Sequence, residues 1–143
     1  MRFPQGTLLQ GMFALLALLA LFAFSGEAQA GRAPLVDPEP VAIPTGLSAE
    51  QVAADIKRAL VGRGWEVVAE QPGQIDSTLH LREHVATIAV SYDDKEVRFA
   101  YVDSSNLDYR VKRGEPQIHS NYLGWIGYLV DDLATNLQVS ATL

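Results

Sequence analysis

Serine, histidine and aspartate occur together in the second half of the chain, a combination that can support nucleophilic catalysis. Asp103, Ser104 and Ser105 precede His119 in the sequence. A serine nucleophile requires an imidazole that accepts its proton and a third group that orients the ring. This segment has neither the strand-turn-helix elbow nor the glycine-rich oxyanion loop that usually accompanies such a serine. We therefore predict a protein that is not an enzyme, and no catalytic residue is assigned.

Three histidines raise the question of a metal site. His80 and His84 have the spacing of a zinc-binding pair on a helix, but the residues around them alternate as in a strand. On a strand and its turn, the two side chains point to opposite faces of the sheet. The chain also contains no cysteine. We expect no bound metal and no cofactor.

Polar side chains gather around a predicted loop and the start of a predicted helix. Hydroxyl, amide and imidazole groups beside exposed N-terminal amides suit an anionic group. The same residue types are also ordinary turn formers and helix caps. Both interpretations remain open, a ligand or partner patch and structural capping. The candidate patch consists of Ser104, Asn106, Tyr109, His119, Asn121 and Tyr122.

Two amphipathic helices are expected to position these groups. Ser48 and Gln51 have the spacing of a capping box, and Gly62 or Gly64 is expected to end the first helix. A longer apolar stripe begins at Ile118 and predicts the second helix. The stretch 103–117 before that helix is expected to be irregular.

Between the helices, residues 65–101 alternate with a period of two and predict four strands joined by short turns. Trp65, Val67 and Ala69 alternate with polar residues along the first strand. A turn at Arg82 and Glu83 would place three residue pairs opposite each other, and a turn at Asp94 and Lys95 would place two more. The pairs are Leu79 with Ala86, Ser77 with Ile88, Ile75 with Val90, Tyr92 with Val97, and Val90 with Phe99.

Both registers put the large apolar residues on one face, and a slip of one residue would scatter them. The predicted fold is therefore α+β, in two layers. A four-stranded antiparallel meander carries the N-terminal and the C-terminal helix on one face, in the order α-β-β-β-β-α.

The other face of the predicted sheet mixes small apolar and hydroxyl side chains with few charges. Such a face can accept a partner or pair with its own copy as a homodimer. It is equally compatible with an ordinary half-solvated antiparallel sheet. The residues assigned to this face are Val68, Val85, Ala89, Ala100 and Val102 among Thr78, Thr87, Ser91 and Arg98.

Residues 1–30 have the pattern of an export signal. Arg2 precedes an apolar run from Met12 to Phe24, and Ala28-Gln29-Ala30 provides a small-x-small cleavage site. The run is closer to the ~7–15 residues of a signal core than to the ~20 needed to span a bilayer. We expect cleavage near Ala30, a periplasmic or secreted protein, and no stable membrane span after cleavage.

The rest of the chain is expected to hold a linker and one domain. Residues 31–46 contain four prolines without a helical period, which predicts an extended linker. Residues 47–143 are expected to form a single α+β domain. The formal net charge of −6 argues against nucleic acid or an anionic membrane surface as the main partner. An envelope protein or a small ligand remains as a possible partner.

Four motifs between about residues 48 and 130 resemble a family of small exported bacterial proteins, many of them lipoproteins, with no assigned activity. The resemblance implies an exported protein but no particular function. Two features depart from the family pattern. The site Ala30-Gly31 lacks a lipid-bearing cysteine, and Leu123-Gly124 replaces a polar pair. The motifs are Arg63-Gly64-Trp65-x-Val67, Leu81-Arg82-x-His84-x-Ala86-x-Ile88, Ser104-x-Asn106-Leu107-x-Tyr109, and Ile118-His119-x-Asn121-Tyr122-x-x-Trp125-Ile126.

These observations predict a non-enzymatic binding or interaction module of the cell envelope. The binding surface would be either the outer sheet face or the candidate patch. The alternative is a small-molecule binder or weak enzyme that uses the patch between the last strand and the second helix.

Overall fold

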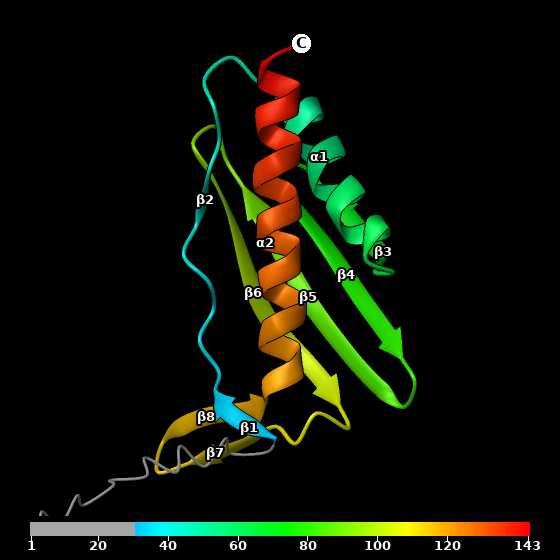
Figure 1. Ribbon diagram of the computed structural model, residues 1–143, viewed down its shortest axis with the longest axis vertical. Coiled ribbons are helices and arrows are strands. Elements are labelled where there is room, and N and C mark those ends of the chain that lie inside the picture. The colour runs from blue at the N-terminus through cyan, green and yellow to red at the C-terminus, as the bar shows by residue number, and fades with distance from the viewer. Residues whose placement is uncertain (1–30) are drawn as a thin grey trace, which may run out of the picture.

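The computed structural model describes residues 31–143, so the predicted export signal lies outside the described residues. A five-stranded sheet has the order β2-β6-β5-β4-β3, and a small three-stranded sheet has the order β1-β8-β7 (Figure 1). All pairings are antiparallel. In chain order the elements are β1 (Arg32–Pro34), β2 (Val41–Ala42), α1 (Ala49–Gly62), β3 (Glu66–Gln71), β4 (Gln74–Leu81), β5 (His84–Tyr92), β6 (Glu96–Ser105), β7 (Arg110–Lys112), β8 (Glu115–His119) and α2 (Ser120–Ala141).

Both helices lie on one face of the five-stranded sheet, and the small sheet lies at one end of the molecule (Figure 1). The core fills the space between these layers and includes Ile56, Ile88, Val90 and Leu133, all fully buried. The predicted two-layer α+β fold is confirmed. No helix within residues 31–143 combines the length and apolar character needed to cross a membrane.

Helix α1 begins where its capping residues predict. The Ser48 backbone N–H donates to Oε1 of Gln51 at 2.8 Å, and the Gln51 N–H donates to Oγ of Ser48 at 3.2 Å. These two bonds satisfy amides that the first helical turn leaves without partners. The helix ends at Gly62, and Arg63 caps it through its backbone N–H. Both predicted boundaries are therefore confirmed.

The central strands pair in the predicted register. Leu79 lies opposite Ala86 across the β4–β5 turn, and Tyr92 lies opposite Val97 across the β5–β6 turn. The large apolar residues of these strands therefore face the helices. A buried serine on the same face, Ser77, donates its hydroxyl to the Glu66 carbonyl oxygen at 2.7 Å.

Two register shifts interrupt the regular alternation. One lies in β3 between Val67 and Ala69, and the other lies in β6 opposite the step from Thr87 to Ile88. Each inserts one extra residue, as a β-bulge does. Because of the first shift, Ala69 is exposed and does not continue the face of Trp65 and Val67. The expectation that Ala69 lies on the same face of the strand as Trp65 and Val67 was therefore wrong.

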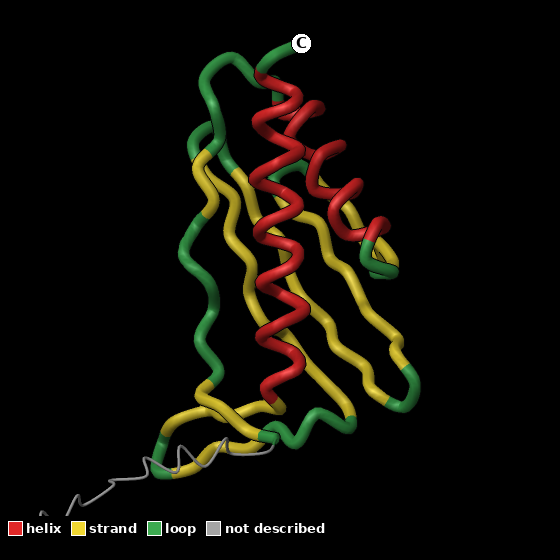
Figure 2. The backbone as a smooth tube through the Cα atoms, in the orientation of Figure 1, coloured by secondary structure: helices red, strands yellow, loops and turns green. Residues whose placement is uncertain are grey.

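Residues 31–46, predicted as a linker, lie along the folded domain. β1 pairs with β8, and β2 pairs with β6. Between these strands, Oδ1 of Asp37 accepts a hydrogen bond from the Tyr101 backbone N–H at 3.1 Å. The segment follows the β6 side of the sheet (Figure 2). Because the backbone of residues 31–46 pairs with strands of both sheets, this segment is part of the folded structure and not only a linker.

The stretch 103–117 is more regular than predicted. β6 continues to Ser105, and β7 and β8 form a hairpin whose turn contains Arg113 and Gly114, at φ of 54° and 78°. Two successive positive φ angles are typical of a tight two-residue hairpin turn. Ile118 lies in β8 and not in α2, because β8 pairs with both β1 and β7. The expectation of an irregular segment was therefore wrong.

Candidate functional site

The six residues of the candidate patch lie at the end of β6, in the loop that follows it, and around the start of α2. Leu107 is almost fully buried, and its carbonyl oxygen accepts a hydrogen bond from the His119 backbone N–H at 2.7 Å. This contact joins the end of β8 to the loop after β6. Five of the six patch residues divide into two groups, one built on tyrosine rings and the other on histidine rings, whereas Asn121 is exposed and takes part only through its backbone N–H.

The tyrosine cluster holds Ser104, Tyr109 and Tyr122 around Tyr101. The hydroxyl groups of Tyr101 and Ser104 are 2.7 Å apart. The Tyr101 ring stacks on Tyr109 with centroids 5.2 Å apart and meets the edge of Tyr122 at 5.6 Å. Burial raises the pKa of both Tyr101 and Tyr122 above the usual tyrosine value. Ser104 is thus paired with a neutral phenol instead of an imidazole.

The histidine cluster joins His84, Asn106 and His119 to Trp125. Nδ1 of His84 donates to the Asn106 carbonyl oxygen at 2.6 Å, and Nδ2 of Asn106 donates to the Glu83 carbonyl oxygen at 2.7 Å. The His84 ring lies 6.4 Å from the His119 ring and 6.2 Å from the Trp125 ring, measured between centroids. Asn106 therefore ties the β4–β5 turn to the end of β6.

His119 serves as the N-cap of α2. Its Nδ1 accepts a hydrogen bond from the Asn121 backbone N–H at 3.1 Å, so this nitrogen carries no proton. The preceding amide of the helix, that of Ser120, donates to the Gly31 carbonyl oxygen at 2.6 Å. Two of the N-terminal amides of α2 are thereby satisfied within the protein, which leaves them unable to hold an anion.

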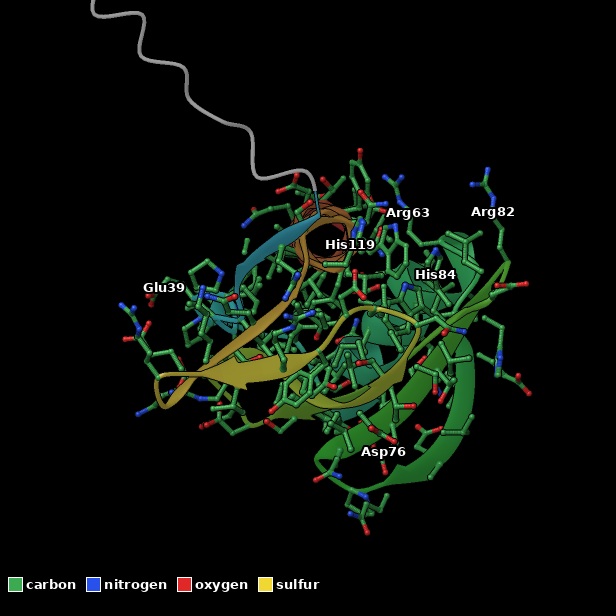
Figure 3. The ribbon with its side chains drawn as sticks, turned by 90° about the horizontal axis from the view of Figure 1, so that it is seen from below. Glu39, Arg63, Asp76, Arg82, His84 and His119 are labelled. Carbon is green, nitrogen blue, oxygen red and sulfur yellow. The ribbon has the colours of Figure 1, made fainter. Side chains whose placement is uncertain are left out.

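The histidines do not assemble a metal site. His80 is exposed on the outer face of β4, whereas His84 lies on the inner face of β5, as strand alternation predicts. His84 and His119 lie on the side that carries α2 (Figure 3). Within residues 31–143, no three histidine, cysteine or carboxylate side chains are placed to share a metal ion.

A small apolar cavity adjoins the histidine cluster through Trp125. It has a volume of about 90 Å³ and includes Trp65 and Leu81 in its wall. Arg63 closes one side, where its Nε and Nη2 donate to the carboxylate of Asp132 at 2.7 and 3.1 Å. The hydrogen bond that Arg63 donates to Asp132 raises the pKa of Arg63 and lowers the pKa of Asp132. With both charges engaged, the cavity has little capacity to recognise a charged ligand.

A larger and more open cavity lies between the N-terminal half of α1 and the β3–β4 turn. Its volume is about 440 Å³, and its walls include Tyr92, Lys57 and Glu70. Nζ of Lys57 and Oε1 of Glu70 form an ion pair at 3.1 Å across it. None of the six candidate residues lines this cavity.

The outer face of the five-stranded sheet has a regular row of polar side chains. Glu66 lies opposite Thr78, Thr78 lies opposite Thr87, and Thr87 lies opposite Asp103. The hydroxyl oxygens of Thr78 and Thr87 are 3.1 Å apart, so the centre of the row is internally bonded. Carboxylates therefore stand at both ends of a row that crosses four strands.

A valine at the position of each β-bulge is exposed on this face. Val68 is 54% exposed and Val102 is 55% exposed. They lie on β3 and β6, on either side of the smaller side chains of β4 and β5, such as Ala89. Asp76 points away from α2 (Figure 3). Strand alternation had assigned Val68 and Val102 to the outer face, and their exposure in the structure agrees with that assignment.

The expectation of few charges on the outer face was incomplete. Glu66, Asp76 and Asp103 form no ion pair within residues 31–143, whereas Arg98 is paired with Glu96. Strand alternation alone places Glu66 and Asp76 outward. The outward placement of Asp103 depends on the β6 bulge, for which the sequence carries no clear signal.

Residues 31–143 form a two-layer α+β fold in which no other described element covers the outer face of the five-stranded sheet (Figure 1). No protein-family model, no curated protein and no solved structure matches this chain. The resemblance of its motifs to a family of small exported proteins therefore stays a prediction.

Proposed function

We propose that this protein is an exported, non-enzymatic binding module of the cell envelope that docks a partner on the outer face of its five-stranded sheet. Export rests on the signal-like pattern of residues 1–30. The observation that supports docking is a sheet face that no other element of the described chain covers, with Val68 and Val102 exposed on it.

The exposed valines carry most of the argument. Complete burial of a valine contributes roughly 1.5–3 kcal/mol, so covering two half-exposed valines would contribute on the order of 2 kcal/mol in total. Each occupies the extra position of a bulge, and strand alternation directs it to the outer face. Between them, the short side chains of Thr78 and Thr87 form a low central surface, the floor of this face, against which another element can pack.

The edges of the sheet are less suitable for a partner than its face. The β6 edge is partly occupied by β2 and by the bond from Tyr101 to Asp37. The β3 edge is interrupted by the bulge at Val68 and carries Glu66 and Glu70. Bulges and charged side chains discourage the addition of a further strand. Docking on the face is therefore favoured over extension of the sheet.

The alternative, a small-molecule site at the candidate patch, has less support. Ser104 is bonded to Tyr101, Asn106 holds the β4–β5 turn, and His119 caps α2. A ligand would have to replace these internal bonds, at a cost comparable to what it could gain.

Site-specific photocrosslinking tests the proposal. A photoreactive amino acid placed at Val68 or Val102 in the full chain, produced in its native host, should give a discrete crosslinked product in the exported fraction. The same substitution at Val139, which is 51% exposed on α2, is the matched control and should give little product. Equal products at all three positions, or none at either outer-face valine, would contradict docking on this face.

Export is tested separately by the N-terminal sequence of the purified protein. We expect the mature chain to begin at Gly31 and to appear in the periplasmic or secreted fraction. A cytoplasmic protein that retains Met12–Phe24 would contradict the export half of the proposal.

A further inference from the structure

We infer that the docked partner is an amphipathic helix with lysine and arginine along its flanks, which lies on the outer face as a third layer. This inference rests on the proposed function and names the chemistry of the partner. It draws on the spacing of the exposed valines, the size of the side chains between them and the unpaired charges beside them.

The spacing of the valines suits a helix. Val68 lies on β3 and Val102 on β6, and β4 and β5 separate them. Three interstrand spacings of ~4.8 Å put these strands about 14 Å apart. An α-helix with its side chains is about 10–12 Å across. A helix aligned with β4 and β5 would therefore contact both valines at once.

The floor between the valines allows a close approach. Thr78, Thr87 and Ala89 carry short side chains and occupy the central strands of this face. The two threonine hydroxyls bond to each other at 3.1 Å, so covering them would leave fewer unsatisfied polar groups. The apolar stripe of a helix can rest on this floor.

The charges determine what the flanks of the helix should carry. Glu66 stands at the β3 end of the threonine row, Asp103 stands at the β6 end, and neither has an ion-pair partner among the described residues. Asp76 lies beside the row on β4. Lysine and arginine extend long apolar stems and place their charges at the rim of a contact, where these carboxylates stand.

The same charges disfavour other occupants. In a homodimer with twofold symmetry through this face, the acidic patch that carries Glu66, Asp76 and Asp103 would face the same acidic patch of the other copy. Such contacts between like charges are unfavourable. An anionic membrane surface or nucleic acid would be repelled for the same reason. A cationic helix is the occupant that matches both the shape and the charge.

The crosslinked products at Val68 and Val102 provide the test when the captured residues are mapped by mass spectrometry. We expect the captured residues to lie in one segment at helical spacing, three, four or seven apart, with lysine or arginine between them. The charge-reversed variant Glu66→Lys/Asp103→Lys should reduce the crosslinked product about tenfold. The neutral variant Glu66→Gln/Asp103→Asn should give an intermediate reduction.

A matched control reverses two exposed carboxylates elsewhere, Asp94→Lys/Asp131→Lys, and should leave the product unchanged. Thermal unfolding of each variant verifies that it remains folded. Capture of a second copy of this chain, of a segment with alternate spacing, or of a segment unaffected by charge reversal would overturn the helical, cationic partner. The absence of any product at both valines would instead contradict the proposed function itself, so the two failures are distinguishable.

Discussion

The hydroxyl groups of Tyr101 and Ser104 lie 2.7 Å apart although the two residues are three positions apart in one strand. In a regular strand, residues three apart point to opposite faces. The register shift that adds Val102 restores Ser104 to the face of Tyr101. One inserted residue therefore does two things: it joins Ser104 to the tyrosine cluster and places Asp103 on the opposite face.

The bond between Tyr101 and Ser104 should contribute measurably to stability. We expect Ser104→Ala and Tyr101→Phe each to lower the free energy of unfolding by about 1 kcal/mol. The double variant should lose less than the sum, because both single changes remove the same bond. Urea denaturation of the four proteins measures this coupling. Fully additive losses would mean that the two hydroxyls act independently.

The buried tyrosines should make the protein sensitive to high pH. Burial, and then the charge of Asp37, raise the pKa of Tyr122 well above the unfolded value of 10.0. Below pH 10 both states keep the proton and stability is unaffected by this group. Above pH 10 the unfolded chain ionises first, so stability falls as the pH rises toward the folded pKa.

At pH 11, one unit above the unfolded pKa, this loss should reach about 1.4 kcal/mol for Tyr122. The variant Tyr122→Phe should not show this part of the decline when unfolding free energies at pH 8 and pH 11 are compared. Tyr128→Phe, at an exposed ring, is the control. An identical decline in Tyr122→Phe and the unmodified protein would contradict the assignment.

Replacing Asn106 by alanine should lower the free energy of unfolding more than replacing it by glycine. Its φ of 55° lies in the left-handed region, and its side chain donates to the Glu83 carbonyl oxygen at 2.7 Å. Asn106→Gly loses only the side-chain bond, about 1 kcal/mol, whereas Asn106→Ala adds a conformational cost of about 1 kcal/mol. Thermal unfolding compares the two variants. If neither changes stability, Asn106 is not a structural clamp and a ligand role regains support.

Asp55 is a buried carboxylate whose ion-pair partner is Arg58, and the protein's stability should depend on that partner. The Asp55 side chain is 2% exposed, its Oδ1 accepts from Nη1 of Arg58 at 2.9 Å, and its Oδ2 has no hydrogen-bond partner among residues 31–143. Arg58→Ala leaves this carboxylate alone and should cost about 2 kcal/mol.

Replacing both residues should recover that stability. In Asp55→Leu/Arg58→Ala, an apolar side chain fills the site and no buried charge remains, so we expect unfolding at a higher urea concentration than for Arg58→Ala alone. Asn136 should keep its bond to the backbone carbonyl oxygen of residue 55 in both variants. A double variant less stable than the single one would show that Asp55 stabilises the helix pair by itself.

The parts of this protein that its sequence determined are those that depend on neighbours in the chain. The capping pair of Ser48 and Gln51 predicted where α1 begins, because both bonds span three residues. The register of the β4–β5 and β5–β6 hairpins followed from short turns and alternation, since a slip would expose the core face. The resulting outward placement of Val68 and Val102 was also predictable.

Tertiary structure alone decided the features that need partners distant in sequence. β1 pairs with β8 across more than eighty residues, and this pairing draws Ile118 into a strand instead of a helix. Arg63 meets Asp132 across 69 positions. The bulge at Val102, which places Asp103 outward and Ser104 inward beside Tyr101, has no clear local signal. Local patterns specify which elements form, whereas the packing of distant elements decides which side chains meet.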